Sequence, residues 1–130
     1  MNKTSISLMF ADIATVGIYF FGEWDIALSS LLIAIALDYI SGIIKAFNTK
    51  QLSSKIGLKG ILKKVGILCI VALSVVLDRL SGDTGAMRSL VIYYFVANEG
   101  LSILENLAEA GLPIPDFIKK ALKALKKEAK

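Results

Sequence analysis

Four long apolar stretches, separated by short charged segments, constrain the fold of this chain more than any other feature. They cover residues of about 5–21, 26–44, 61–77 and 86–104. Each is close to the roughly 20 residues that a helix needs to cross a lipid bilayer. Lone strands would leave backbone groups unpaired in lipid, so spanning segments must be helical. The pattern predicts an all-α integral membrane protein with four transmembrane helices.

The composition agrees with this class and argues against most enzymes. Of the 130 residues, 55% are hydrophobic, compared with about 45–50% in soluble domains, and a small soluble fold buries little of its surface. The chain has no histidine, and Cys69 is its only cysteine. A disulfide within the chain, a histidine-based catalytic pair and the common metal-ligand clusters are therefore excluded. We expect no enzymatic activity, no cofactor, no metal and no nucleic-acid partner.

The lysines indicate how the chain crosses the membrane. The link at 45–64 carries six lysines and no acid, and the stretch 119–130 carries six more, whereas the short loops at 22–25 and 78–85 are acidic. Lysine-rich loops stay on the cytoplasmic side of a membrane. We therefore expect the basic link and both termini to be cytoplasmic.

The four stretches differ in how readily they should insert. Ten Leu or Ile residues in the second stretch contribute about −3 to −6 kcal/mol, against about +2.5 to +3.5 kcal/mol for a central Asp38. The first stretch has eight Leu, Ile, Val or Phe residues and Asp12, so its total is closer to zero. Whether the first stretch is always inserted stays open.

The end of the chain reads as a separate unit. The segment Gly-Leu-Pro-Ile-Pro at 111–115 should break the fourth helix and divide a transmembrane domain, 1–110, from a tail, 111–130. After Asp116 the apolar residues repeat at helical spacing with lysines opposite. This pattern predicts a basic amphipathic helix on the inner leaflet; a solvated basic tail is the alternative.

Anionic membrane lipids are the expected partners of the basic segments, because lysines near a membrane surface are attracted to them. The lysines expected to contact the inner leaflet are Lys55, Lys59, Lys63, Lys64, Lys119, Lys120, Lys123, Lys126 and Lys127.

Two helix faces are small or polar within these apolar stretches. In the second, residues recur at gaps of three and four: Ala27, Ser30, Ala34, Asp38, Ser41 and Lys45. In the fourth, the polar residues are Asn98, Glu99, Ser102, Glu105 and Asn106. A carboxylate in contact with lipid is costly, so these faces should contact protein or water. Two interpretations remain open. In the first, the acids of these faces are structural, and they are protonated or paired with lysines of the link inside one bundle. In the second, the faces contact other subunits and later line a water-filled lesion.

Several of these segments resemble the toxin-secretion/phage-lysis holin family. The run DYISGIIKA at 38–46 resembles its second-span signature, and LSSKIGLKGILKK at 52–64 is similar to its basic link. NEGLSILEN at 98–106 and GLPIP at 111–115 are similar to its fourth-span motif and closing turn. Order and spacing agree from about Ala34 to Leu125.

The resemblance implies a multi-pass protein of the bacterial host's cytoplasmic membrane. Holins form homo-oligomers and open lesions at a set time. An endolysin then reaches the cell wall, with no required direct contact between the two, and relatives beside toxin genes are linked to toxin release. The family implies no catalytic residue.

Other interpretations remain open at this point. A small four-span transporter also has intramembrane acids, but it would need an internal repeat or a central acid in its first span, and Asp12 lies near one end. A membrane scaffold without pore formation, or a toxin–antitoxin component, is the remaining class. A second start at Met9 would remove Lys3, and whether it makes a regulatory product is also open.

Overall fold

A computed structural model describes residues 1–129 and shows five helices, with no strand in that part of the chain. They are α1 (Lys3–Phe21), α2 (Ile26–Asn48), α3 (Ser54–Leu80), α4 (Ala86–Glu109) and α5 (Asp116–Ala129). The prediction of an all-α protein is thus confirmed.

Three of these helices, α1, α2 and α3, are long and apolar enough to cross a membrane. The fourth helix, α4, is of similar length but carries Arg88, Glu99 and Glu105 among its apolar residues. Length and composition therefore support three candidate spans rather than the four that were expected.

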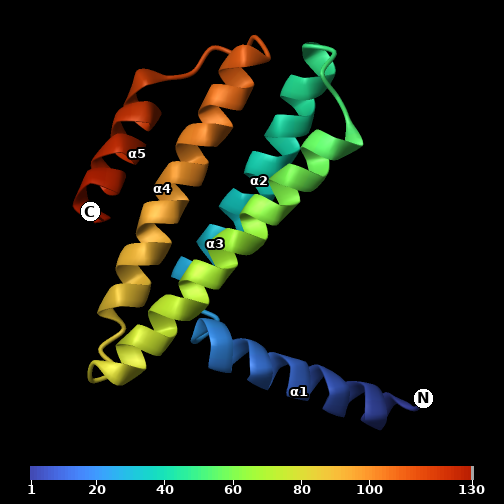
Figure 1. The fold of residues 1–130 in the computed structure, drawn as a ribbon, viewed down its shortest axis with the longest axis vertical. Coiled ribbons are helices and arrows are strands. Elements are labelled where there is room, and N and C mark those ends of the chain that lie inside the picture. Colours follow the sequence, from blue (N-terminus) through green and yellow to red (C-terminus); the bar gives the residue numbers. More distant parts are fainter. Residues whose placement is uncertain (130) are drawn as a thin grey trace.

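The helices α2, α3 and α4 lie side by side as a bundle (Figure 1). Its core is formed by Leu31 of α2, Ile67 and Val71 of α3, and Ile92 of α4, all of which are buried. The first helix, α1, leaves the bundle at an angle, so that the N-terminus lies far from α2–α4 (Figure 1). No residue of α1 is buried, and only its last residue, Phe21, packs against the core.

The third helix begins earlier than the apolar pattern suggested. It starts at Ser54 rather than near residue 61, so much of the basic link is helical. The side chain of Ser53 accepts a hydrogen bond from the N–H of Ile56 at 3.2 Å, which caps the helix start. Lysine is a good helix former, so the lysine-rich sequence after this cap extends the helix beyond the apolar residues.

The tail folds back along the bundle. Helix α4 ends at Glu109, and Gly111, with φ of 97°, reverses the chain before α5. Helix α5 then lies alongside α4 (Figure 1). The helical content of the tail agrees with the sequence, but α5 packs against the preceding domain instead of standing apart from it.

Candidate functional site

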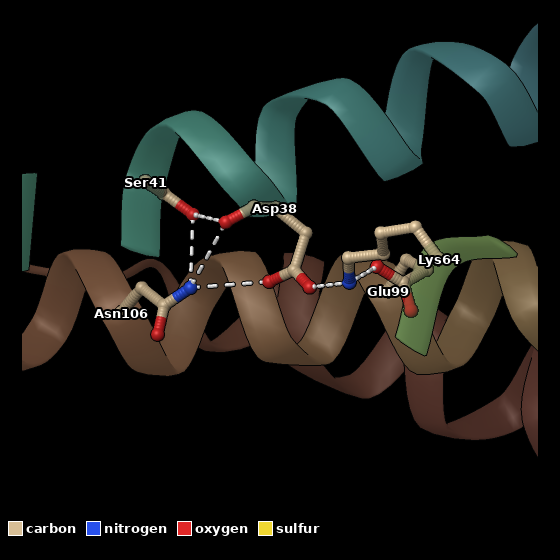
Figure 2. Close-up of polar contacts among 5 residues, drawn as sticks. All are labelled: Asp38, Ser41, Lys64, Glu99 and Asn106. Carbon is tan, nitrogen blue, oxygen red and sulfur yellow. Dashed lines mark hydrogen bonds and ion pairs between the residues drawn. The ribbon is translucent and has the colours of Figure 1, made fainter. Parts of the chain in front are cut away.

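One lysine joins two carboxylates at the centre of the bundle. The ammonium group of Lys64 on α3 donates to Asp38 Oδ2 on α2 and to Glu99 Oε2 on α4 (Figure 2). The side chains of Lys64, Asp38 and Glu99 are only 16%, 10% and 5% exposed. We call these three residues the Asp38–Lys64–Glu99 network, and it ties all three helices of the bundle together.

Neutral polar groups satisfy the rest of this site. The side-chain amide of Asn106 on α4 donates to Asp38 Oδ1 at 3.1 Å and to Ser41 Oγ at 3.0 Å. The hydroxyl of Ser41 donates to the backbone carbonyl of Asp38 at 3.0 Å (Figure 2). Within residues 1–129, no buried side-chain nitrogen or oxygen lacks a hydrogen-bond partner. A polar cluster that is fully satisfied rigidifies and specifies a core, whereas a partly satisfied one destabilises it.

The charges in the network do not balance. Two carboxylates and one ammonium leave one negative charge when all three groups are ionised. Removing such charges from water carries a large desolvation cost, which close ion pairs and hydrogen bonds offset. The arrangement suits a structural clamp, and it also provides groups that can be satisfied by water or by another subunit.

The small and polar face of α2 is what brings α4 close. Ala34, Asp38 and Ser41 are buried there, while Ala27 and Ser30 are partly buried. At the end of the same face, Lys45 Nζ lies 3.0 Å from Glu109 Oε2 on α4. In this structure the predicted face of α2 therefore makes contacts within one subunit.

The polar residues predicted on α4 separate into different environments. Glu99 and Asn106 join the network, and Ser102 lines a groove beside it. Asn98 points elsewhere and accepts a hydrogen bond from Lys126 of α5 at 3.0 Å, and Glu105 is exposed.

The predicted lipid-contacting lysines also divide into groups. Lys64 lies inside the bundle, apart from the others, because two acids bind it there. Lys126 lies over the ring of Tyr94 at 5.5 Å, as part of the contact between α5 and α4. The remaining members are exposed: Lys55, Lys59, Lys63, Lys119, Lys120, Lys123 and Lys127.

A close approach of backbone and side chain helps α5 to pack on α4. A Cβ atom at Gly100 would lie only 2.8 Å from Leu122 Cδ2, so glycine leaves room for that leucine. A larger residue at position 100 would require the side chain of Leu122 to shift.

Arg88 holds together the opposite end of the bundle, in a role that the sequence did not reveal. Its guanidinium donates to the carbonyl of Phe21 at 2.6 Å, the carbonyl of Glu23 at 3.0 Å and the carboxylate of Asp25 at 2.9 Å. The turn between α1 and α2 includes Gly22, whose φ is 81° and whose added Cβ would lie 2.6 Å from Arg88 Nε. Glycine is needed there for both reasons.

Asp78 is a second residue that the sequence did not single out. Its carboxylate accepts hydrogen bonds from the N–H groups of Met87 and Arg88, both at 2.9 Å. These N–H groups belong to the first turn of α4, where Gly85 occupies the N-cap position and has no side chain to cap the helix. A glycine directly before an apolar helix is the sequence feature that indicates this contact. Glycine has no side chain that can accept hydrogen bonds from the first N–H groups of the helix, so a more distant acid accepts them.

Comparison with known proteins gives this chain a family. The sequence profile of the bacteriophage holin family matches residues 15–127. An uncharacterized protein of Clostridium perfringens is 48% identical over 115 residues, covering 87% of this chain and 84% of that protein. A protein of Bacillus phage phi105 named as a probable holin is 35% identical over 100 residues, covering 77% of this chain and 73% of its own length. No solved structure matches. The family profile spans most of the chain, and the protein therefore belongs to the bacteriophage holin family.

Proposed function

We propose that the protein is a phage holin that forms homo-oligomers in the cytoplasmic membrane of a bacterium and opens lesions in it. Through these lesions an endolysin, or in some settings a toxin, leaves the cytoplasm as cargo without binding the holin directly. The protein acts without catalysis. The observation that carries the proposal is a satisfied ion network inside an apolar bundle, in a chain that belongs to the holin family.

In the proposed arrangement α4 crosses the membrane with α1, α2 and α3. The ends of α2 and α4 that meet at Lys45 and Glu109 then face the cytoplasm, as do both termini. Arg88, Asp25 and Asp78 lie at the outer end. The acids and Asn98 on α4 lower its mean hydropathy, and α4 inserts because the bundle satisfies Glu99 and Asn106. Residues 111–130 form the cytoplasmic tail.

The polar side chains give this bundle two ways to be stable. In a single subunit Asp38, Glu99 and Asn106 satisfy one another through Lys64. In a dense assembly the same groups face neighbouring subunits and then water, because lipid cannot satisfy them. Opening at a critical density follows from the exchange of one set of partners for the other.

Induced expression in a bacterium with a cytoplasmic reporter enzyme tests the function. Membrane potential and released reporter are followed over time, and membrane insertion is checked by fractionation. Abrupt loss of potential with release of the enzyme after a delay supports a large lesion. Loss of potential alone indicates a small pore. An inserted protein that causes neither contradicts the proposal and favours a transporter or a scaffold.

A further inference from the structure

A groove of about 990 Å³ lies between the last turns of α2 and the first turns of α3. Its apolar lining includes Tyr39, Ile43, Ile56 and Ile61, and the side chain of Lys63 stands at its edge. The volume is at the upper end of the range of about 300–1,000 Å³ typical of ligand pockets. The groove thus combines an apolar interior with a cationic edge.

The edge of the groove carries one cation that is not paired with an acid, Lys63. Lys63 is exposed, as are Lys55 and Lys59, which lie on the same face of α3 but do not line the groove. In the described part of the chain no carboxylate lies within 4 Å of them, whereas Lys45 and Lys64, which also line the groove, are paired with acids. An unpaired positive charge at an apolar groove complements a ligand with an anionic head and a hydrocarbon tail.

Backbone groups add to this positive region. Helix α3 begins at Ser54, another residue of the groove, and Ser53 binds only the N–H groups of Ile56 and Gly57. Among residues 1–129, the N–H groups before them have no hydrogen-bond partner, and they lie at the positive end of a 27-residue helix. The start of α3 therefore adds positive potential at one end of the groove.

We propose that this groove is a binding site for one anionic phospholipid of the inner leaflet. The phosphate lies beside Lys63, and one acyl chain runs along Tyr39, Ile43 and Ile61. The inference rests on the proposed function, which places this end of the bundle on the cytoplasmic side of the membrane. Unlike a general attraction of lysines to a charged surface, this site holds one lipid in one groove.

Tryptophan fluorescence provides a test with a matched control. Trp24, the only tryptophan, is first removed by Trp24→Phe. A single tryptophan is then introduced into this background by Ile61→Trp or by Leu62→Trp. Both positions are exposed at the same level of α3, but only Ile61 lines the groove. The full-length variants are reconstituted in vesicles of phosphatidylcholine with phosphatidylglycerol. In one set of vesicles the phosphatidylglycerol carries bromine on its acyl chains as a quencher, and in the other set the phosphatidylcholine does.

At Ile61→Trp we expect brominated phosphatidylglycerol to be preferred about fivefold over brominated phosphatidylcholine, the ratio that one lysine near an anionic lipid provides. At Leu62→Trp the two lipids should quench nearly equally. Adding Lys63→Gln should remove the preference at Ile61→Trp, whereas Lys123→Gln on α5 should leave it. An excess of soluble glycerol phosphate should not compete, because it has no acyl chain.

Equal quenching by both lipids at Ile61→Trp, or an unchanged preference after Lys63→Gln, would overturn the lipid site. Competition by glycerol phosphate would replace it with a site for free phosphate. Leakage of the same vesicles is recorded in parallel. Variants that leak normally without a lipid preference would contradict this inference alone and leave the proposed function intact.

Discussion

A single ammonium group, that of Lys64, lies between two buried carboxylates from different helices. If that ammonium is removed, Asp38 and Glu99 face each other without a counterion inside an apolar bundle. The neighbouring Lys63 points outwards and has no such role. Two adjacent lysines therefore differ in what they contribute to the stability of the fold.

Lys64→Met should lower the free energy of unfolding by about 3–5 kcal/mol, the usual cost of breaking a buried ion pair. Lys63→Met, the matched control, should change it by less than about 0.5 kcal/mol. Unfolding in mixed micelles, followed by circular dichroism, measures both values. Adding Glu99→Gln to Lys64→Met should recover part of the loss. Equal effects of the two lysine substitutions would show that the network does not hold the bundle together.

Asp25, at the other end of the bundle, makes the free energy of unfolding depend on pH. Its hydrogen bond to the Arg88 side chain lowers the pKa of Asp25 below its ordinary value of 3.8. A lowered pKa in the folded state stabilises the fold above about pH 4, and this contribution is lost as the pH falls through the folded value. The difference in unfolding free energy between the natural protein and Asp25→Asn should be constant from pH 5 to 8 and shrink below pH 3.8. The effect is small because Asp25 is 43% exposed. A difference that grows on acidification would contradict this assignment.

At the scale of helices, the first turn of α4 depends on an acid from α3. Asp78 accepts hydrogen bonds from two N–H groups that Gly85 cannot satisfy. Asp78→Asn removes the charge and one of the two acceptor oxygens, and it should destabilise the protein by about 1 kcal/mol, as the loss of a helix cap does. Asp83→Asn in the same loop is the control, because asparagine tolerates its positive φ of 57°.

Hydrogen exchange of the amides at 86–89 measures this prediction locally. Exchange in this turn should accelerate in Asp78→Asn and stay unchanged in Asp83→Asn. Equal acceleration in both variants would assign the effect to the charge of the loop rather than to the cap.

Helix boundaries and faces could be predicted from the sequence more completely than contacts between helices. The apolar runs predict where α1 and α2 lie, and the glycine and prolines at 111–115 predict where the chain turns before α5. The early start of α3 is not predicted by the apolar pattern, because six lysines favour a loop there. Ser53 is nevertheless a good cap, and lysine favours helices.

The pairing of Lys64 with both acids could not be read from spacing. The three residues are far apart in the chain, and their meeting depends on how α2, α3 and α4 cross in space. Spacing predicts that Asp38 and Glu99 avoid lipid, but it does not choose among the lysines of the link. Adjacent residues of a helix point in directions about 100° apart, so Lys64 faces the bundle while Lys63 is exposed.

At the scale of the molecule, the ion network sets how stable the closed subunit is. Glu99→Leu leaves one carboxylate and one ammonium, which balance each other, so the closed bundle should be more stable. Lysis after induction should therefore be delayed relative to the natural protein. Asp38→Leu should also change lysis timing, because it removes the acceptor for both Lys64 and Asn106.

Glu105→Leu is the control for these timing measurements, since Glu105 is exposed and lies on the same helix. Onset of lysis is read from culture turbidity, and oligomer size is measured by crosslinking in membranes. Unchanged timing and oligomer size in both Asp38→Leu and Glu99→Leu would contradict a role for the network in opening.

The proposed holin function requires that this chain alone opens lesions large enough for a protein. Purified full-length protein is reconstituted at increasing density in vesicles that contain a small dye and a protein-sized dextran with a second dye. Above a threshold density we predict that both are released together. If correctly inserted protein retains the dextran at every density, the chain does not form such lesions and the proposed function is wrong.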